Sequence, residues 1–219
     1  GISLMKTHNI ALLSLLLAAG TAVQAASQVD LAVTGRLTPT ACTPLLSNGA
    51  VIDYGKISHQ DLNVDKGTRL PIKPLQVRIA CNGANRFALR MRDNRDGSAM
   101  VNSEIYYGLG LDHSGNRIGL YSMAFDPRQT IVDGSTLVYG TESTTGGLAW
   151  RTANLNPINI GAKSYLGFTD IAGSTAGPSA IQELTSTVQV ETVINATQNL
   201  DLSRDIALDG LATLEVVYL

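Results

Sequence analysis

The chain has 219 residues, of which 44% are hydrophobic and 16% are charged, and its formal net charge at pH 7 is −2. This balance argues against a nucleic-acid binder and against a polybasic membrane binder, because both carry an excess of positive charge. The length is sufficient for one domain with a sizeable hydrophobic core.

The N-terminal residues have the pattern of a cleavable signal peptide. A short basic region around Lys6 precedes an apolar run from Ile10 to Gly20, and small residues follow. This order predicts an exported protein with cleavage after Ala25. The run is shorter than the about 20 residues that a membrane-spanning helix needs, so a retained anchor is less favoured. We expect residues 1–25 to be removed, residues 1–4 being an upstream extension, which leaves no integral membrane segment.

The segment that cleavage would uncover alternates apolar and polar residues. A period of two is typical of a β-strand, and Pro39 limits strand pairing beyond it. The sequence therefore predicts an extended arm over residues 26–37 and a folded domain over residues 38–219. The candidate strand residues of the arm are Val29, Leu31, Val33, Gly35 and Leu37.

Cys42 and Cys81 are the two cysteines of the chain. An even number of cysteines in an exported protein favours a disulfide. A disulfide that closes the loop between positions 42 and 81 would stabilise the folded protein by about 4 kcal/mol in the chain-entropy treatment. A zinc site is disfavoured, because the chain has no Cys-x-x-Cys motif and few histidines.

The rest of the chain predicts an all-β fold. Alternation and β-branched residues dominate, and helical periodicity is almost absent. Residues 112–116 predict a hairpin connection. Many short strands with Gly, Asn and Asp turns favour a β-sandwich or a barrel. The expected strands cover residues 51–57, 70–81, 87–92, 106–111, 118–125, 136–139, 164–170, 188–194 and 214–218.

Taken in order, these features resemble subunits of chaperone–usher fimbriae. The arm alternates, carries Gly35 and leads to a cysteine, and the spacing of Cys42 and Cys81 resembles that of the pilin disulfide. The apolar segment 50–57 and the penultimate Tyr218 resemble pilin motifs as well. The middle of the chain is similar to a poorly characterised family of fimbria-associated periplasmic proteins, a domain of unknown function, at residues 93–95, 107–111, 118–121 and 150.

The resemblance implies an immunoglobulin-like, pilin-type β-sandwich that lacks its final strand. In such subunits a periplasmic chaperone fills the open groove with its own strand, and the arm of the next subunit replaces that strand in the fibre. The arm residues would enter a neighbour's groove, with Gly35 where a side chain has no room. Pilins carry a glycine a few residues before the position of Gly210, which leaves the register of the groove open. The C-terminal residues implied for the groove and the chaperone contact are Leu214, Val216, Tyr218 and the carboxylate of Leu219.

The expected function is that of a structural subunit of a chaperone–usher fimbria, which assembles by donor-strand exchange and contributes to surface adhesion. The expected partners are a periplasmic chaperone, an outer-membrane usher and other fimbrial subunits. The expected location is the periplasm and then the fimbrium on the surface of a Gram-negative bacterium. An alternative is a soluble periplasmic accessory or ligand-binding protein whose arm completes its own fold. We expect no enzyme, cofactor or metal, because no base–nucleophile pair is visible.

Three further signals favour structural interpretations. Residues 93–97 look like half a calcium loop, but the full ligand pattern is lacking and a plain turn is favoured. Trp150 and the tyrosines at 106, 107 and 121 could stack on sugars, but packing is favoured. His59 is expected in a solvated loop and His113 in a turn.

Overall fold

A computed structural model of the protein divides into two units, residues 1–38 and residues 39–219. It describes residues 32–36, 41–153 and 156–219. No helix within these described ranges is long and apolar enough to cross a membrane.

The first unit is described at Ala32–Arg36, which are exposed and have no regular secondary structure. Val33 exposes 90% of its surface. No atom lies within 4 Å of the position that a Cβ at Gly35 would take, so nothing in the described part of this chain requires a glycine there. The predicted role of Gly35 in a neighbour's groove stays a prediction. The donor positions Val29, Leu31 and Leu37 lie outside the described residues, as does the predicted signal peptide.

The second unit is all-β, as predicted, and the immunoglobulin-like, pilin-type sandwich stays a prediction. Its named strands pair antiparallel, and the helices in the described ranges are single 3-10 turns at Ser47–Ala50, His59–Asp61 and Thr197–Asn199. The strands are β1 (Cys42–Leu46), β2 (Thr68–Arg69), β3 (Lys73–Asp93), β4 (Tyr107–Gly108), β5 (Gly119–Val132), β6 (Tyr139–Ser143), β7 (Arg151–Thr152), β8 (Ile158–Asn159), β9 (Tyr165–Thr169), β10 (Ala180–Ile194) and β11 (Ala212–Tyr218).

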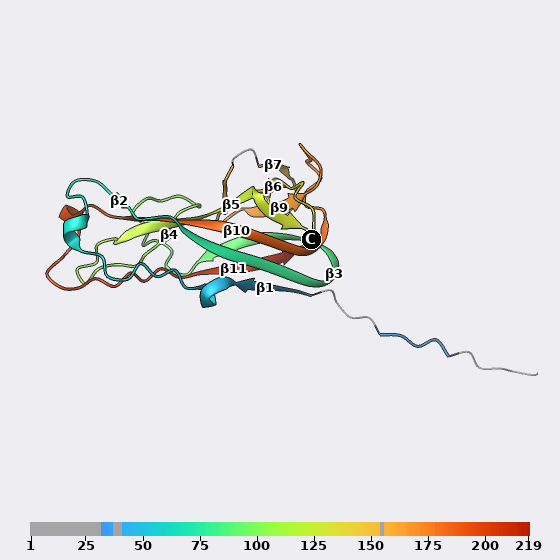
Figure 1. The fold of residues 1–219 in the computed structure, drawn as a ribbon, viewed down its shortest axis with the longest axis horizontal. Coiled ribbons are helices and arrows are strands. Elements are labelled where there is room, and N and C mark those ends of the chain that lie inside the picture. The colour runs from blue at the N-terminus through green and yellow to red at the C-terminus, as the bar shows by residue number, and fades with distance from the viewer. Residues whose placement is uncertain (1–31, 37–40, 154–155) are drawn as a thin grey trace, which may run out of the picture. The chain divides into compact units, whose positions relative to one another are not determined.

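The long strand β3 organises the sheet, and it changes partners along its length (Figure 1). Up to Arg86 it lies between β1 and β10. From Phe87 onward it pairs with β11, and Leu89 pairs with β9. β10 also pairs with β5, and β9 also pairs with β6, so the strands form one curled antiparallel sheet.

One main hydrophobic core fills the curl. Along the first part of β3, Leu75, Val77 and Ile79 are buried while the residues between them are exposed, which is the period of two that a half-buried strand requires. Both parts of the curled sheet contribute, since Phe125 of β5 and Phe168 of β9 lie 5.8 Å apart between ring centroids. A smaller second core forms around Leu109, Ile118 and Ile194.

The predicted disulfide between Cys42 and Cys81 is confirmed. The two residues lie directly opposite each other in the β1–β3 ladder. The bond therefore fastens the start of β1 to the middle of β3.

The strand predicted over residues 51–57 is wrong, because this segment is irregular in the structure. β1 stops at Leu46, and the turn that follows holds Asn48 and Ala50 at positive φ, which redirects the chain. The sequence does not predict β1 either, because a proline such as Pro44 is more typical of a loop than of a strand. The two segments predicted over 70–81 and 87–92 are one strand, β3.

Candidate functional site

Among the residues that the structure describes, the C-terminal strand β11 has one unpaired edge. Its other edge pairs with β3 from Ala212 to Tyr218, and no second strand of the described ranges pairs with it. Two flanking bonds set the direction of its backbone groups: the Asn94 N–H donates to the Leu211 carbonyl, and the Leu219 N–H donates to the Arg86 carbonyl. Because antiparallel strands alternate, the odd-numbered residues face β3. The N–H groups on the open edge are those of Ala212, Leu214, Val216 and Tyr218.

The side chains beneath this edge are apolar and incompletely covered. Ala212, Leu214 and Val216 pack against the main core but remain half-buried. Tyr218, at the end of the strand, exposes 48% of its surface. The structure therefore brings the residues predicted to line a groove together on one strand. The predicted role of Leu219 toward a chaperone stays a prediction.

β1 has an edge of a different character near the end of β11. The Cys42 N–H donates to the Tyr218 hydroxyl over 2.7 Å, which joins the start of β1 to the end of β11. Because the Asn82 N–H donates to the Ala41 carbonyl, the even-numbered residues of β1 face away from β3. Of these, Cys42 is already bonded and Pro44 has no N–H, so this edge offers few donors to another strand.

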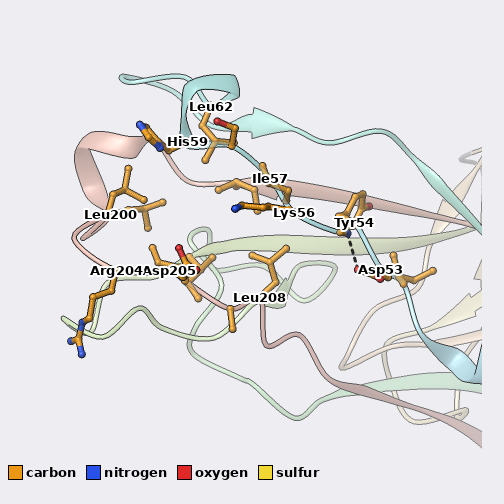
Figure 2. Close-up of a pocket in the computed structure, with 18 residues that line it drawn as sticks. Asp53, Tyr54, Lys56, Ile57, His59, Leu62, Leu200, Arg204, Asp205 and Leu208 are labelled. Carbon is orange, nitrogen blue, oxygen red and sulfur yellow. Dashed lines mark hydrogen bonds between the residues drawn. The ribbon is translucent and has the colours of Figure 1, made fainter.

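A cleft lies beyond β1 and β11. In Figure 1 the segment after β1 and the segment before β11 run side by side along the unit. They enclose a cleft of about 770 Å³, whose walls are drawn in Figure 2. Its apolar lining includes Ile52, Ile57, Leu62, Ile118, Ile206 and Leu208. Acidic and basic side chains also line it, namely Asp53, Lys56, His59, Arg204 and Asp205.

One wall of the cleft, residues 51–58, is attached to β10 through Tyr54. The Tyr54 hydroxyl donates to the Thr192 hydroxyl over 3.1 Å. The Lys73 ammonium lies 5.5 Å from the centre of the Tyr54 ring, within the range of a cation–π contact. These contacts fix the middle of this wall against the sheet.

The opposite wall begins at an interlocked cluster of Asp112, His113, Ser114 and Asp201. The Asp201 N–H donates to the Asp112 carboxylate over 2.8 Å. The Asp201 carboxylate accepts from the Ser114 hydroxyl over 2.5 Å and lies 2.7 Å from His113 Nε2. The loop predicted as a hairpin connection is therefore attached to a segment almost 90 residues further along the chain.

Electrostatics favour the ionised form of both acids in this cluster. Burial disfavours the charge of Asp112, but hydrogen bonds from Asp201, Asn116 and Ser114 outweigh burial and lower its pKa to about 2. Hydrogen bonds from Ser114 and Ser203, with the nearby His113, lower the pKa of Asp201 as well. Both carboxylates therefore stay charged well into the acid range.

The same wall ends at a second cluster, in which Arg95 holds Asp209. Arg95 Nε and Nη2 donate to the two carboxylate oxygens of Asp209, each over 2.8 Å, and the Asp209 N–H donates to the Leu109 carbonyl. Arg95 belongs to the turn at residues 94–97. The carboxylate of Asp93, the last residue of β3, accepts from the N–H groups of Arg95 and Gly108. The segment that resembles half a calcium loop is thus a turn, as predicted, and it positions the start of β11.

We predict that Asp112→Asn lowers the melting temperature at pH 7 and flattens the acid dependence of stability. The folded-state pKa of Asp112 lies below that of a free aspartate, so its contribution is complete above about pH 4 and disappears as the pH falls through about 2. Thermal melts of both proteins between pH 2 and pH 7 test this. Parallel curves for the two proteins would contradict it.

The structure also places the aromatic residues and the histidine that the sequence singled out. Trp150 packs over Gly177, where an added Cβ would lie 2.9 Å from the indole nitrogen, and Trp150 Nε1 donates to the Gly147 carbonyl. Tyr107 and Tyr121 pack with ring centroids 5.4 Å apart. Packing is therefore confirmed for these aromatic residues. His59 is exposed, as expected, and it lines the cleft.

Sequence reasoning did not find Asp201 and Asp209. Their partners lie 87 and 114 residues away in the chain, and no local pattern marks such a pair. The motif at 93–95 gave a signal, but it could not reveal that Arg95 faces the start of β11.

Known proteins are similar to this chain. The profile of a family described as "Protein of unknown function (DUF1120)" matches residues 31–105. The "Uncharacterized protein YhcF" of Escherichia coli (strain K12) is 28% identical over 224 residues, which cover 90% of this chain and 92% of YhcF. "Protein GltF" of the same organism is 23% identical over 226 residues, which cover 88% of this chain and 89% of GltF. These similarities agree with the resemblance to a poorly characterised family, and none of the names states a function.

Proposed function

We propose that the protein is a structural subunit of a chaperone–usher type fimbria, which accepts a strand at β11 and donates its own arm to a neighbour. The observation that carries this proposal is the open edge of β11 above half-buried apolar side chains. Edge N–H groups combined with pockets for alternate side chains are what strand addition requires.

The curled sheet is compatible with an incomplete immunoglobulin-like sandwich. One group of strands, in the order β5, β10, β3 and β1, shares the main core with a second group made of β11, the end of β3, β9 and β6. β3 serves both groups because it changes partners after Arg86. A strand added to the free edge of β11 would complete the second group.

The connectivity of the chain supports donation of the arm over self-completion. The arm joins the domain just before Cys42, which lies at the C-terminal end of β11 because it bonds Tyr218. An arm folded back into its own groove would therefore run parallel to β11. A neighbour's arm has no such constraint and can pair antiparallel, which is slightly more stable per residue. A folded-back arm would also form a hairpin with β1, whose outward edge is poor in donors.

The arm carries enough apolar surface to drive this association. Four side chains, at Val29, Leu31, Val33 and Leu37, would each gain about 1.5–3 kcal/mol on burial, or about 6–12 kcal/mol together before ordering costs. In this account a periplasmic chaperone covers the β11 edge first, an outer-membrane usher mediates the exchange, and other subunits follow. The assembled fimbrium at the cell surface would contribute to adhesion.

The alternative is a self-complemented periplasmic accessory or ligand-binding protein. The observation that favours it is the cleft of about 770 Å³, which is large enough for a small ligand.

The decisive experiment measures the polarity and the origin of the strand at β11. The mature chain, residues 26–219, is prepared without a chaperone as two double variants, Ser27→Cys with Thr213→Cys and Thr38→Cys with Thr213→Cys. We expect the second variant to form cross-links between chains in a ladder of masses, because an antiparallel arm places residue 38 near the start of β11. Cross-links within single chains of the first variant, with a monomer at all concentrations, would instead establish self-completion.

A further inference from the structure

The Tyr218 side chain links the end of β11 to the start of β1. Its hydroxyl accepts from the Cys42 N–H over 2.7 Å. That N–H lies on the edge of β1 that faces away from β3, and the Tyr218 N–H lies on the open edge of β11. The two strands lie side by side in Figure 1, so the tyrosine side chain spans the space between these two edges.

One partner in this hydrogen bond is fixed and the other is movable. Cys42 is held by its disulfide with Cys81 and by its place opposite that residue in the β1–β3 ladder. Tyr218 is the last residue of β11, and its side chain is half-exposed. Such a side chain has few packing contacts to break, so the hydroxyl can leave Cys42 while β1 stays in place.

The Tyr218 side chain lies where an incoming arm would insert. The even-numbered residues before it in β11 pack their side chains against the main core, so by alternation Tyr218 faces inward as well. An antiparallel arm with residue 38 opposite Thr213 has Val33 opposite Tyr218, and residues directly opposite point to the same face of a sheet. The Val33 side chain would therefore enter the space that the Tyr218 ring crosses to reach Cys42.

We propose that Tyr218 is a latch across the acceptor edge of β11, and that an incoming arm releases it from Cys42 when Val33 pairs at this position. The inference rests on the proposed function, and the incoming arm is that of a second copy. The hydrogen bond between Tyr218 and Cys42 is then present only in the free subunit, so it opposes capture of the arm. Main-chain hydrogen bonds and the burial of Val33 offset its loss when the arm reaches Tyr218.

The test uses as its parent the mature chain with Val33→Asp, which disables its own arm, and a peptide of residues 26–37 as the ligand. Tyr218→Phe removes the hydroxyl and keeps the ring. We expect this variant to bind the peptide about fivefold more tightly than the parent, which is the ordinary worth of one hydrogen bond. The gain should appear in the association rate, with the dissociation rate unchanged, because the bound state lacks the hydrogen bond in both proteins.

Tyr54→Phe is the matched control. It also removes a tyrosine hydroxyl that forms a hydrogen bond, but its partner is Thr192 of β10. This variant should bind the peptide with the affinity and the association rate of the parent.

Amide hydrogen exchange tests the latch without the peptide and separates it from the proposed function. The Cys42 N–H of the free chain should exchange about fivefold faster in the Tyr218→Phe variant than in the parent. Equal exchange of Cys42, or peptide binding by Tyr218→Phe that is no tighter than binding by the parent, would overturn the latch even if the parent captures the peptide. Capture of the peptide by neither protein would contradict the proposed function, and the latch with it.

Discussion

Val33→Asp will abolish assembly of the mature chain, whereas Thr34→Asp will leave it nearly intact. The two residues are neighbours in an alternating arm, so one faces the groove and the other faces solvent. Loss of the Val33 contact and burial of a carboxylate together weaken association by about 100-fold or more. Analytical ultracentrifugation across a concentration series measures the effect.

The comparison is controlled within the arm itself. Both variants add the same charge one residue apart, so a general effect of charge on solubility would affect them equally. Both should also retain the melting temperature of the monomeric domain, because the arm lies outside its core. Equal assembly of the two variants would contradict the predicted facing of the arm.

Replacing Cys42 and Cys81 together with serine will lower the free energy of unfolding by about 4 kcal/mol. For a domain of this size the melting temperature should fall by about 8–16 °C. The loss should be concentrated at the start of β1, where the disulfide fastens the strand to the middle of β3. Chemical denaturation and hydrogen exchange of the double variant measure both effects.

Tyr218→Phe is the matched control for this prediction. It removes the hydroxyl that accepts from the Cys42 N–H but retains the disulfide. Its cost should be about 1 kcal/mol, the ordinary value of one hydrogen bond. A double serine variant as stable as the parent would contradict this prediction. It would mean that the disulfide does not reduce the conformational entropy of the unfolded chain.

The sequence predicts the strands well where one face is buried. In β3 the alternation of Val77 and Ile79 with polar neighbours reports burial directly, and the even cysteine pair reports the disulfide. The sequence-based prediction fails at residues 51–57, where an apolar segment lines a cleft and does not pair with another strand. Composition indicates burial but does not identify hydrogen-bond partners. β1 is missed for a related reason, since Pro44 is acceptable only because its missing N–H would point away from β3.

The candidate site is predicted only in part. The alternation of Leu214 and Val216 indicates a strand with one buried face, but it says nothing about which edge of that strand is open. Arg95 and Asp209 meet across 114 residues of the chain, and such contacts follow from topology rather than from local pattern. The clusters that shape the cleft therefore become visible only in three dimensions.

The most direct test is amide hydrogen exchange along β11 in a mature chain whose own arm is disabled by Val33→Asp. The N–H groups of Ala212, Leu214, Val216 and Tyr218 should exchange fast, and those of Thr213, Glu215 and Val217, which face β3, should be protected. Adding a peptide of residues 26–37 should slow the four edge amides by about tenfold or more. Edge amides that are already protected, or that saturating peptide leaves unchanged, would contradict the claim that β11 accepts the arm of another subunit.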